Sequence, residues 1–269
     1  MGDHPGPKAG RGYWDAVGGQ WAADRRDELW RRCSDAVHAR WLDVAAGDLP
    51  PGRVLKTDLF DEAFGDGLTP WFEERGHTVV ACDLALTTAS GAARRRARVT
   101  AAVADVRQLP FPASAFDTVF SDSTLDHFES EAGIRQSLRE LRRVLRPGGT
   151  LLLTMDNPAN PIVRLRNLAP GFWMRLGILP YAVGATCGAA RLAGVVEDAG
   201  FGVVSTATIM HAPRVLLVPV CRWLARRGVS RPGPRWRGWL RRLESLDRLP
   251  TRQVTGHFVA LAARARTIS

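Results

Sequence analysis

Short apolar runs alternate with amphipathic stretches over most of the chain. Trp14 to Ala46 carries apolar residues at spacings of mostly three or four, which predicts two amphipathic helices joined near Ala23–Arg26. After a loop at Asp48–Gly52, strand-like runs begin and helix-like stretches separate them. The predicted strands are Arg53–Thr57, Thr78–Cys82, Val99–Ala104, Phe116–Ser121, Thr150–Met155, Val203–His211 and Gly256–Ala263.

This alternation of short strands and helices indicates parallel pairing with helices on both faces of the sheet. Glu131–Leu145 is helical in pattern and ends at the Gly/Pro stop Arg146–Gly149, and Arg191–Ala199 predicts a further helix. Two segments interrupt the alternation, at about 157–190 and about 213–252. We therefore expect an α/β protein with these parts: a flexible N-terminus (1–12), N-terminal helices (13–47) and one domain (48–269) that holds both insertions.

Size and composition are those of an ordinary globular domain. The chain has 269 residues, of which 45% are hydrophobic and 24% are charged, and this excludes global disorder. The four cysteines stand far apart without a C-x-x-C pair, so we expect no disulfide framework and no metal site. No signal peptide and no clean apolar run of 18 residues is visible, so we expect a cytoplasmic protein.

The net charge of +10 is concentrated in one block of the chain. Residues 213–252 hold eleven arginines against Glu244 and Asp247, a local net charge of +9, together with three tryptophans. Three interpretations are open: a solvated helix pair, an amphipathic element that contacts an anionic membrane surface, or a nucleic-acid-binding surface. Nucleic acid is the least favoured, because no zinc finger, helix-turn-helix or RNA-binding signature accompanies the charge.

Polar side chains follow three of the predicted strands. A doubly wound sheet binds its ligand at the carboxyl ends of the strands. Asp83 ends the second strand and can accept two hydrogen bonds from a ribose diol; alternatively it caps the next helix. Asp105 follows the third strand, where it either holds the exocyclic amine of adenine or is a plain turn residue. Ser121 and Asp122 follow the fourth strand, shortly before His127.

Two blocks of sequence resemble a known family. Ala104–Pro112 (ADVRQLPFP) with Phe116–Ser121 (FDTVFS), and Leu141–Leu153 (LRRVLRPGGTLLL), are similar to class I S-adenosylmethionine-dependent methyltransferases of the small-molecule, type 11-like kind. Glu197–Phe201 resembles the family's turn before the sixth strand. The resemblance implies a Rossmann-like seven-stranded sheet, S-adenosyl-L-methionine as the cofactor, and methyl transfer to a small and, we expect, lipophilic acceptor.

The resemblance also implies roles for individual residues. His127 and Asp122 are the candidate catalytic residues, because a histidine titrates near neutral pH and can remove a proton from the acceptor. Asp156, Asn157 and Tyr181 are the substrate-side candidates, and an Asx turn is the alternative for the first two. The expected cofactor-binding residues are Asp58, Glu62, Gly65, Gly67, Asp83, Leu84, Asp105, Val106 and Ser121.

The first loop departs from the family pattern. The family places an acidic-x-Gly-x-Gly-x-Gly loop after the first strand, but here Asp58, Phe60 and Glu62 replace the early glycines, and Gly65 and Gly67 follow about one helical turn later. Glycines serve such a loop by allowing a tight turn against the methionyl part of the cofactor. We expect the carboxylates of Asp58 and Glu62 to compensate by facing the cofactor's ammonium or sulfonium group.

Two other functions stay open beside a small-molecule methyltransferase. One is a methyltransferase fold that has lost catalysis and serves as a binding module, and the other is a nucleic-acid methyltransferase. For the basic block at 213–252 we expect helices that border the acceptor site and make peripheral contact with anionic membranes.

Overall fold

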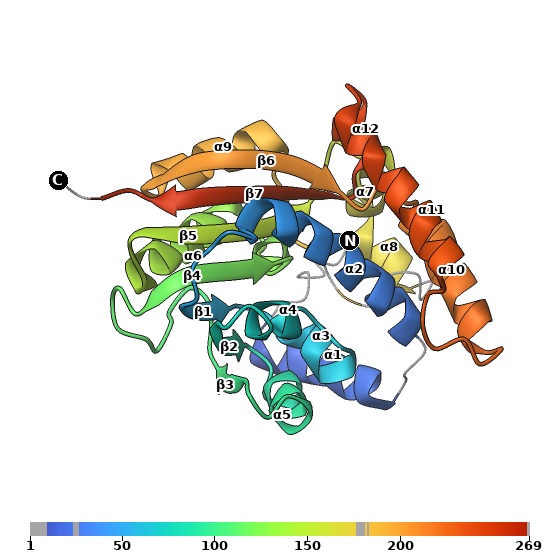
Figure 1. The fold of residues 1–269 in the computed structure, drawn as a ribbon, viewed down its shortest axis with the longest axis horizontal. Helices are drawn as coiled ribbons and strands as arrows, with labels where there is room; N and C mark the ends of the chain where they lie inside the picture. Colours follow the sequence, from blue (N-terminus) through green and yellow to red (C-terminus); the bar gives the residue numbers. More distant parts are fainter. Residues whose placement is uncertain (1–9, 24–26, 176–180, 182, 268–269) are drawn as a thin grey trace, which may run out of the picture.

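The computed structural model describes residues 10–23, 27–175, 181 and 183–267. Within them, a seven-stranded sheet has the order β3-β2-β1-β4-β5-β7-β6 (Figure 1). β1 to β5 pair in parallel, as the sequence predicted, and β7 lies antiparallel between β5 and β6. The strands are β1 (Arg53–Lys56), β2 (Thr78–Asp83), β3 (Thr100–Val103), β4 (Phe116–Asp122), β5 (Leu145–Asp156), β6 (Phe201–Ile209) and β7 (Phe258–Ala265).

The fifth strand differs most from its prediction. It begins at Leu145 rather than at Thr150, because the segment expected to end the preceding helix already pairs with β4, with Leu145 opposite Phe116. Gly148 adopts a φ of +73° within this segment, a conformation that glycine tolerates without strain. A Gly/Pro stop therefore ends the helix here but also starts the strand.

Helices flank the sheet on both faces (Figure 1). On one face of the sheet, the amphipathic helix α6 buries Ile134, Leu138, Leu141 and Val144, which recur at helical spacing. The helices are α1 (Arg11–Ala23), α2 (Glu28–Ala46), α3 (Phe60–Phe64), α4 (Thr69–Glu73), α5 (Leu86–Arg95), η1 (Leu125–His127), α6 (Glu131–Val144), α7 (Pro161–Leu168), α8 (Pro170–Arg175), α9 (Ala189–Asp198), α10 (Arg214–Ala225), α11 (Pro234–Glu244), η2 (Ser245–Arg248) and α12 (Arg252–Thr255).

The two faces of the sheet have separate cores. α6 and α9 cover one face around β4, β5, β6 and β7, while α2 and α4 cover the other. α10 and α11 pack on α2, and α1, α3 and α5 group beside β2 and β3. None of the helices in the described part of the chain is long and apolar enough to cross a lipid bilayer.

The N-terminal segment and the two insertions are described in part. Residues 1–9 of the expected flexible N-terminus lie outside the described residues, whereas Arg11 and Gly12 already belong to α1. The first insertion holds α7 and α8, and its residues 176–180 and 182 lie outside the described part. The second insertion holds α10, α11, η2 and α12.

The basic block is more than a solvated helix pair. Leu217 and Cys221 of α10 and Leu240 of α11 are buried in the same core as α2. The Trp236 indole N–H also donates to the Cys33 thiol of α2 at 3.2 Å. Each of the two helices therefore buries an apolar side, while its arginines mostly remain at the surface.

Candidate active site

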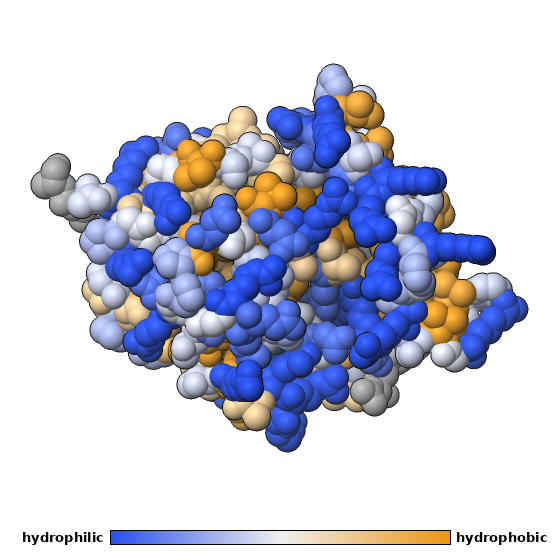
Figure 2. All heavy atoms as spheres, in the orientation of Figure 1, coloured by the Kyte–Doolittle hydropathy of each residue, from blue (hydrophilic) through white to orange (hydrophobic). Residues whose placement is uncertain are grey.

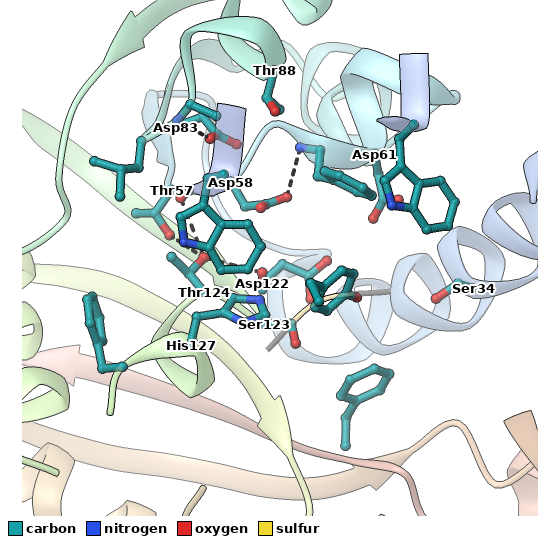
Figure 3. A pocket seen from close by; sticks show the side chains of 18 of the residues that line it. Ser34, Thr57, Asp58, Asp61, Asp83, Thr88, Asp122, Ser123, Thr124 and His127 are labelled. Atoms are coloured by element: carbon teal, nitrogen blue, oxygen red, sulfur yellow. Dashed lines mark hydrogen bonds between the residues drawn. The ribbon is translucent and has the colours of Figure 1, made fainter. Parts of the chain in front are cut away.

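A cavity of about 1200 Å³ opens at the carboxyl ends of β1, β2 and β4. Its walls come from these strand ends, from α1 and α2 at the start of the chain, and from α7 and α10 in the two insertions. Figure 3 shows Asp58, Asp83 and Asp122 from three strand ends on one side of this space. The cavity therefore lies where a doubly wound sheet binds its ligand.

Asp83 lies at the end of β2 and lines the cavity beside Leu84. Its two carboxylate oxygens accept the backbone N–H groups of Leu59, at 3.1 Å, and Ala85, at 2.8 Å. Burial raises the pKa of Asp83, and these two N–H donors act against that effect. Each carboxylate oxygen accepts more than one hydrogen bond, so holding this turn and receiving a ligand hydroxyl are compatible roles.

Asp105 and Val106 line the same end of the cavity. The Asp105 carboxylate already receives the Arg107 guanidinium, with Nη2 at 2.6 Å from Oδ2, and the Arg107 backbone N–H at 2.8 Å. Burial raises the pKa of Asp105, but these Arg107 donors outweigh it, so the pKa is lowered. The Arg107 guanidinium also lies 5.0 Å from the Phe128 ring centroid. The turn role that the sequence left open is thus present, and the contact with adenine stays a prediction.

The first loop brings acidic side chains into the cavity. Asp58 and Asp61 line it, and Asp58 Oδ1 accepts the Phe60 backbone N–H at 3.0 Å (Figure 3). Burial raises the pKa of Asp58 well above its usual value; Lys56 lowers it, while Asp83 and Asp61 raise it further. A cation bound here would relieve the repulsion between these carboxylates.

Glu62, Gly65 and Gly67 are outside the cavity wall, contrary to their predicted contact with the cofactor. Glu62 is fully buried: its Oε2 accepts Lys56 Nζ at 3.0 Å, and its Oε1 accepts the backbone N–H groups of Leu68 and Thr69. Gly67 has a φ of +64°, and a Cβ there would lie 2.4 Å from the Glu62 carboxyl group. These residues stabilise the loop from behind, because the buried Lys56 requires an acidic partner.

Ser121 is also not part of the cavity wall. Its side chain is buried at the end of β4 and accepts a hydrogen bond from the Thr57 hydroxyl at 2.9 Å. Thr57 and Thr124 line the cavity instead, with their hydroxyl oxygens 3.0 Å apart. Ser121 is therefore a supporting residue rather than a cofactor contact.

Asp122 lines the cavity and pairs with a histidine that sequence reasoning missed. His38 Nε2 of α2 lies 3.3 Å from Asp122 Oδ1, and Thr154 donates a hydrogen bond to the same oxygen. Burial would lower the pKa of His38, but Asp122 outweighs it and raises this pKa to about 9. Burial would likewise raise the pKa of Asp122, yet His38, Lys56 and Thr154 hold it at about 2. The pair is thus ionised, and Asp122 is a weak proton acceptor.

His127 lies in η1 at the centre of an aromatic group that lines the cavity. Its ring centroid is 4.7 Å from that of Trp14 on α1 and 5.5 Å from that of Tyr181. Its Nε2 is 4.0 Å from the buried Asp126 carboxylate. His127 and Tyr181 are therefore brought together as predicted candidates, and the N-terminal Trp14 covers them.

Asp156 and Asn157 do not line the cavity, in contrast to their predicted contact with substrate. Asp156 is buried in an ion pair with Arg166 of α7. Asn157 donates to the carbonyl oxygens of Gln253 and Gly256, and its own side-chain oxygen accepts the Ala159 N–H at 3.1 Å. The Asx turn that the sequence allowed is thus what the structure contains, and Asn157 connects the two insertions.

The half of the cavity remote from Asp83 is apolar and aromatic with a few cationic groups. Sequence reasoning missed most of it, since α2, α7 and α10 reach it from distant parts of the chain. A signal was present on α2, where Arg31, Ser34 and His38 share one helix face at spacings of three and four. The missed lining residues are Trp30, Arg31, Ser34, His38, Ile162, Val163, Arg166, Arg214, Val215, Val218, Arg222, His257 and Phe258.

Comparisons with known proteins agree with this geometry. Residues 63–153 match the family model described as a methyltransferase domain. A malonyl-[acyl-carrier protein] O-methyltransferase of Enterobacter lignolyticus is 30% identical over 131 residues, which cover 48% of this chain and 47% of that protein. A demethylmenaquinone methyltransferase of Paenarthrobacter aurescens is 32% identical over 141 residues, covering 51% and 52%.

The structural similarity extends further along the chain. The crystal structure of 1,6-didemethyltoxoflavin-N1-methyltransferase from Burkholderia thailandensis, with its substrate and S-adenosylhomocysteine bound, matches with a TM-score of 0.56. The match has 18% identity and covers 98% of this chain and 93% of that one. The chain spans about half the length of the curated relatives that it matches. Residues 63–153 are thus similar to a methyltransferase domain, and the seven-stranded sheet has the fold of the solved methyltransferase.

Proposed function

We propose that the cavity binds S-adenosylmethionine and that the chain transfers its methyl group to a small acceptor held in the same cavity. The observation that carries this proposal is one continuous space that joins the acidic strand ends to an apolar, aromatic compartment. At about 1200 Å³ the cavity exceeds the roughly 300–1000 Å³ that is typical of a pocket for one drug-sized ligand. Its size therefore suits two molecules bound side by side.

The residues at the strand ends fit this cofactor. Asp83 would receive the ribose hydroxyls, and Asp105 with Val106 would border the adenine. Asp58 and Asp61 would face the methionyl part, whose ammonium and sulfonium groups are positive. Since burial and neighbouring carboxylates raise the pKa of Asp58, a cationic ligand is the chemistry that this site favours.

When bound, S-adenosylmethionine would supply a methyl group on a positively charged sulfur. Trp14, His127 and Tyr181 would hold the acceptor against it and exclude water. Such alignment alone can contribute ~7–11 kcal/mol to lowering the barrier. For an acceptor that must lose a proton, His127 is the proposed base, because Asp122 with its pKa of about 2 accepts a proton poorly.

The compartment beside His127 supports an acceptor of lipophilic character. Ile162 and Val163 of α7, Val218 of α10 and Phe258 of β7 line it. The relatives named above act, by their names, on malonyl groups of acyl carrier protein and on demethylmenaquinone. From the apolar lining of this compartment, we propose a small apolar acceptor for this chain.

Calorimetric titration with S-adenosylmethionine and S-adenosylhomocysteine tests the proposal. We expect one binding site of micromolar affinity for each. Absence of binding at millimolar concentration, by a protein whose thermal unfolding is cooperative, would refute cofactor binding and favour a cofactor-free binding module. Tight, steeply salt-dependent binding of DNA or RNA would instead support a nucleic-acid methyltransferase.

A further inference from the structure

Four arginines from the three helices α2, α7 and α10 reach the acceptor half of the cavity, and one of them differs from the rest. Arg214 has no carboxylate oxygen within 4.0 Å among the described residues. Near the other three, a carboxylate neutralises the guanidinium; the pairs are Arg31–Asp61, Arg166–Asp156 and Arg222–Asp27. Within the described part of the chain, the positive charge of Arg214 is therefore not neutralised by a direct ion pair.

Arg214 is the first residue of α10 and is partly buried in the cavity wall. Burial would lower the pKa of Arg214, but nearby Tyr181 and Asp156 outweigh it and raise this pKa. The guanidinium also lies 5.6 Å from the Trp30 ring centroid. A guanidinium has five N–H donors, and the contacts with Tyr181 and Trp30 engage few of them. The remaining donors favour a ligand with several acceptor oxygens, because donors left unmet in an apolar space are costly.

His257 supplies a second, independent sign of an absent polar partner. It is 6% exposed and lines the cavity directly before β7. Its Nε2 lies 3.4 Å from Asp156 Oδ1 without forming a hydrogen bond, and neither atom has a hydrogen-bond partner among the described residues. Because burial lowers the pKa of His257 to about 3, the ring is neutral. Asp156, Arg166, Arg214 and His257 together thus carry a net charge of +1.

We propose that Arg214, with His257 beside it, forms an anion subsite, and that the acceptor is an apolar molecule bearing one carboxylate. This inference rests on the proposed methyltransferase function and specifies its substrate class. A planar guanidinium binds a carboxylate with two parallel hydrogen bonds. One surplus positive charge matches one negative charge, and the apolar residues Val163, Val218 and Phe258 surround the place where a hydrocarbon or aromatic body would lie.

A comparison of the affinities of matched acids and methyl esters tests the subsite. The full chain, saturated with S-adenosylhomocysteine, is titrated with saturated fatty acids of six to twelve carbons and with phenylacetate, each against its own methyl ester. We expect at least one acid to bind roughly tenfold to a hundredfold more tightly than its ester, the usual contribution of a hydrogen bond to a charged group. Arg214→Met should abolish this preference, and Arg214→Lys should keep part of it.

Arg226→Met is the matched control, because Arg226 follows the same helix and is exposed. It should leave the preference for the acid unchanged, and all variants should bind S-adenosylhomocysteine as the wild type does. Equal affinity of the wild type for acids and esters, no binding of any acid, or an acid preference that survives in Arg214→Met would each overturn the inference. If the wild-type protein did not bind S-adenosylhomocysteine at all, the proposed methyltransferase function would be overturned instead.

Discussion

The His38–Asp122 ion pair joins the N-terminal helix α2 to the end of β4 inside the cavity wall. His38 is 4% exposed, and its Nδ1 also contacts the Ser34 carbonyl oxygen at 2.9 Å. Both ring nitrogens therefore have acceptors, and the charged imidazolium is favoured over the neutral ring. The pair fixes the position of Asp122 beside the proposed cofactor site.

This pair makes the stability of the protein depend on pH. The pKa of His38 is raised from 6.5 to about 9 in the folded state, so its contribution is complete below about pH 6.5 and is lost as the pH rises through about 9. We expect the free energy of unfolding of the wild type to fall by a few kcal/mol between pH 6.5 and 9.5, and that of His38→Gln to fall less. Urea unfolding of both proteins across this range measures the difference. If the free energy of unfolding fell equally with pH in both proteins, the pair would not be ionised as described.

Asp83 is the residue whose change should affect cofactor binding most directly. Asp83→Asn keeps one of the two side-chain oxygens that accept the N–H groups of Leu59 and Ala85, and removes the negative charge. We expect S-adenosylmethionine to bind about 1.5–3 kcal/mol more weakly, the scale of a hydrogen bond to a charged group. Asp198→Asn, at an exposed position at the end of α9, is the control for calorimetry. Unchanged affinity in a folded Asp83→Asn protein would show that the ribose assignment is wrong.

Individual site residues could be predicted where the strand order alone places them. Asp58, Asp83, Asp105 and Asp122 follow strands whose carboxyl ends meet at one edge, and all four line the cavity. Glu62 could not be placed in this way, because its direction depends on the buried Lys56 and on the turn at Gly67. The sequence therefore misplaced residues of two kinds. Some have partners that are distant in the chain, and others depend on an unusual backbone conformation nearby.

Glu62 and Gly67 stabilise the conformation of the first loop, which follows β1. Gly67→Ala should destabilise the protein by at least ~1 kcal/mol, because the positive φ strains an alanine and its Cβ would meet the Glu62 carboxyl group. Gly194→Ala is the matched control: Gly194 lies inside α9, where no atom is within 4 Å of an added Cβ. It should stabilise the protein by roughly 0.5–1 kcal/mol. Urea unfolding measures the change in stability of each variant. Equal changes for the two substitutions would contradict this account of the loop.

Helix α10 exposes apolar residues beside the cavity. Val215, Leu216 and Trp223 are each more than half exposed, at 53%, 65% and 51%, and Figure 2 shows apolar surface among hydrophilic residues on the side of α10 and α11. Membrane contact by this basic block stays a prediction from the sequence. We expect weak, reversible sedimentation with anionic vesicles that falls as salt rises from ~50 to ~300 mM, since exposed charges are screened over ~8–10 Å.

Leu216→Glu should reduce this sedimentation, because it places a negative charge on the apolar surface of α10. Val44→Glu, at an 86% exposed apolar position on α2, is the control and should have no comparable effect. Equal, negligible sedimentation with anionic and neutral vesicles at low salt would remove the membrane hypothesis.

The whole molecule builds its cavity from both ends of the chain. The sheet and its acidic edge follow from local patterns, so the architecture could be predicted from the sequence. The acceptor half requires α1 and α2 from the N-terminal region to meet α7 and α10 from the insertions. Those contacts join residues up to about two hundred positions apart, such as Asp27 with Arg222, and no local pattern encodes them.

The structure of the chain crystallised with S-adenosylhomocysteine tests the central claim most directly. The account predicts the ribose hydroxyls at hydrogen-bonding distance from Asp83, the amino-acid part beside Asp58, and the sulfur facing the compartment that contains His127 and Tyr181. A cofactor bound elsewhere on the protein, or this cavity without the cofactor at saturating concentration, would contradict it.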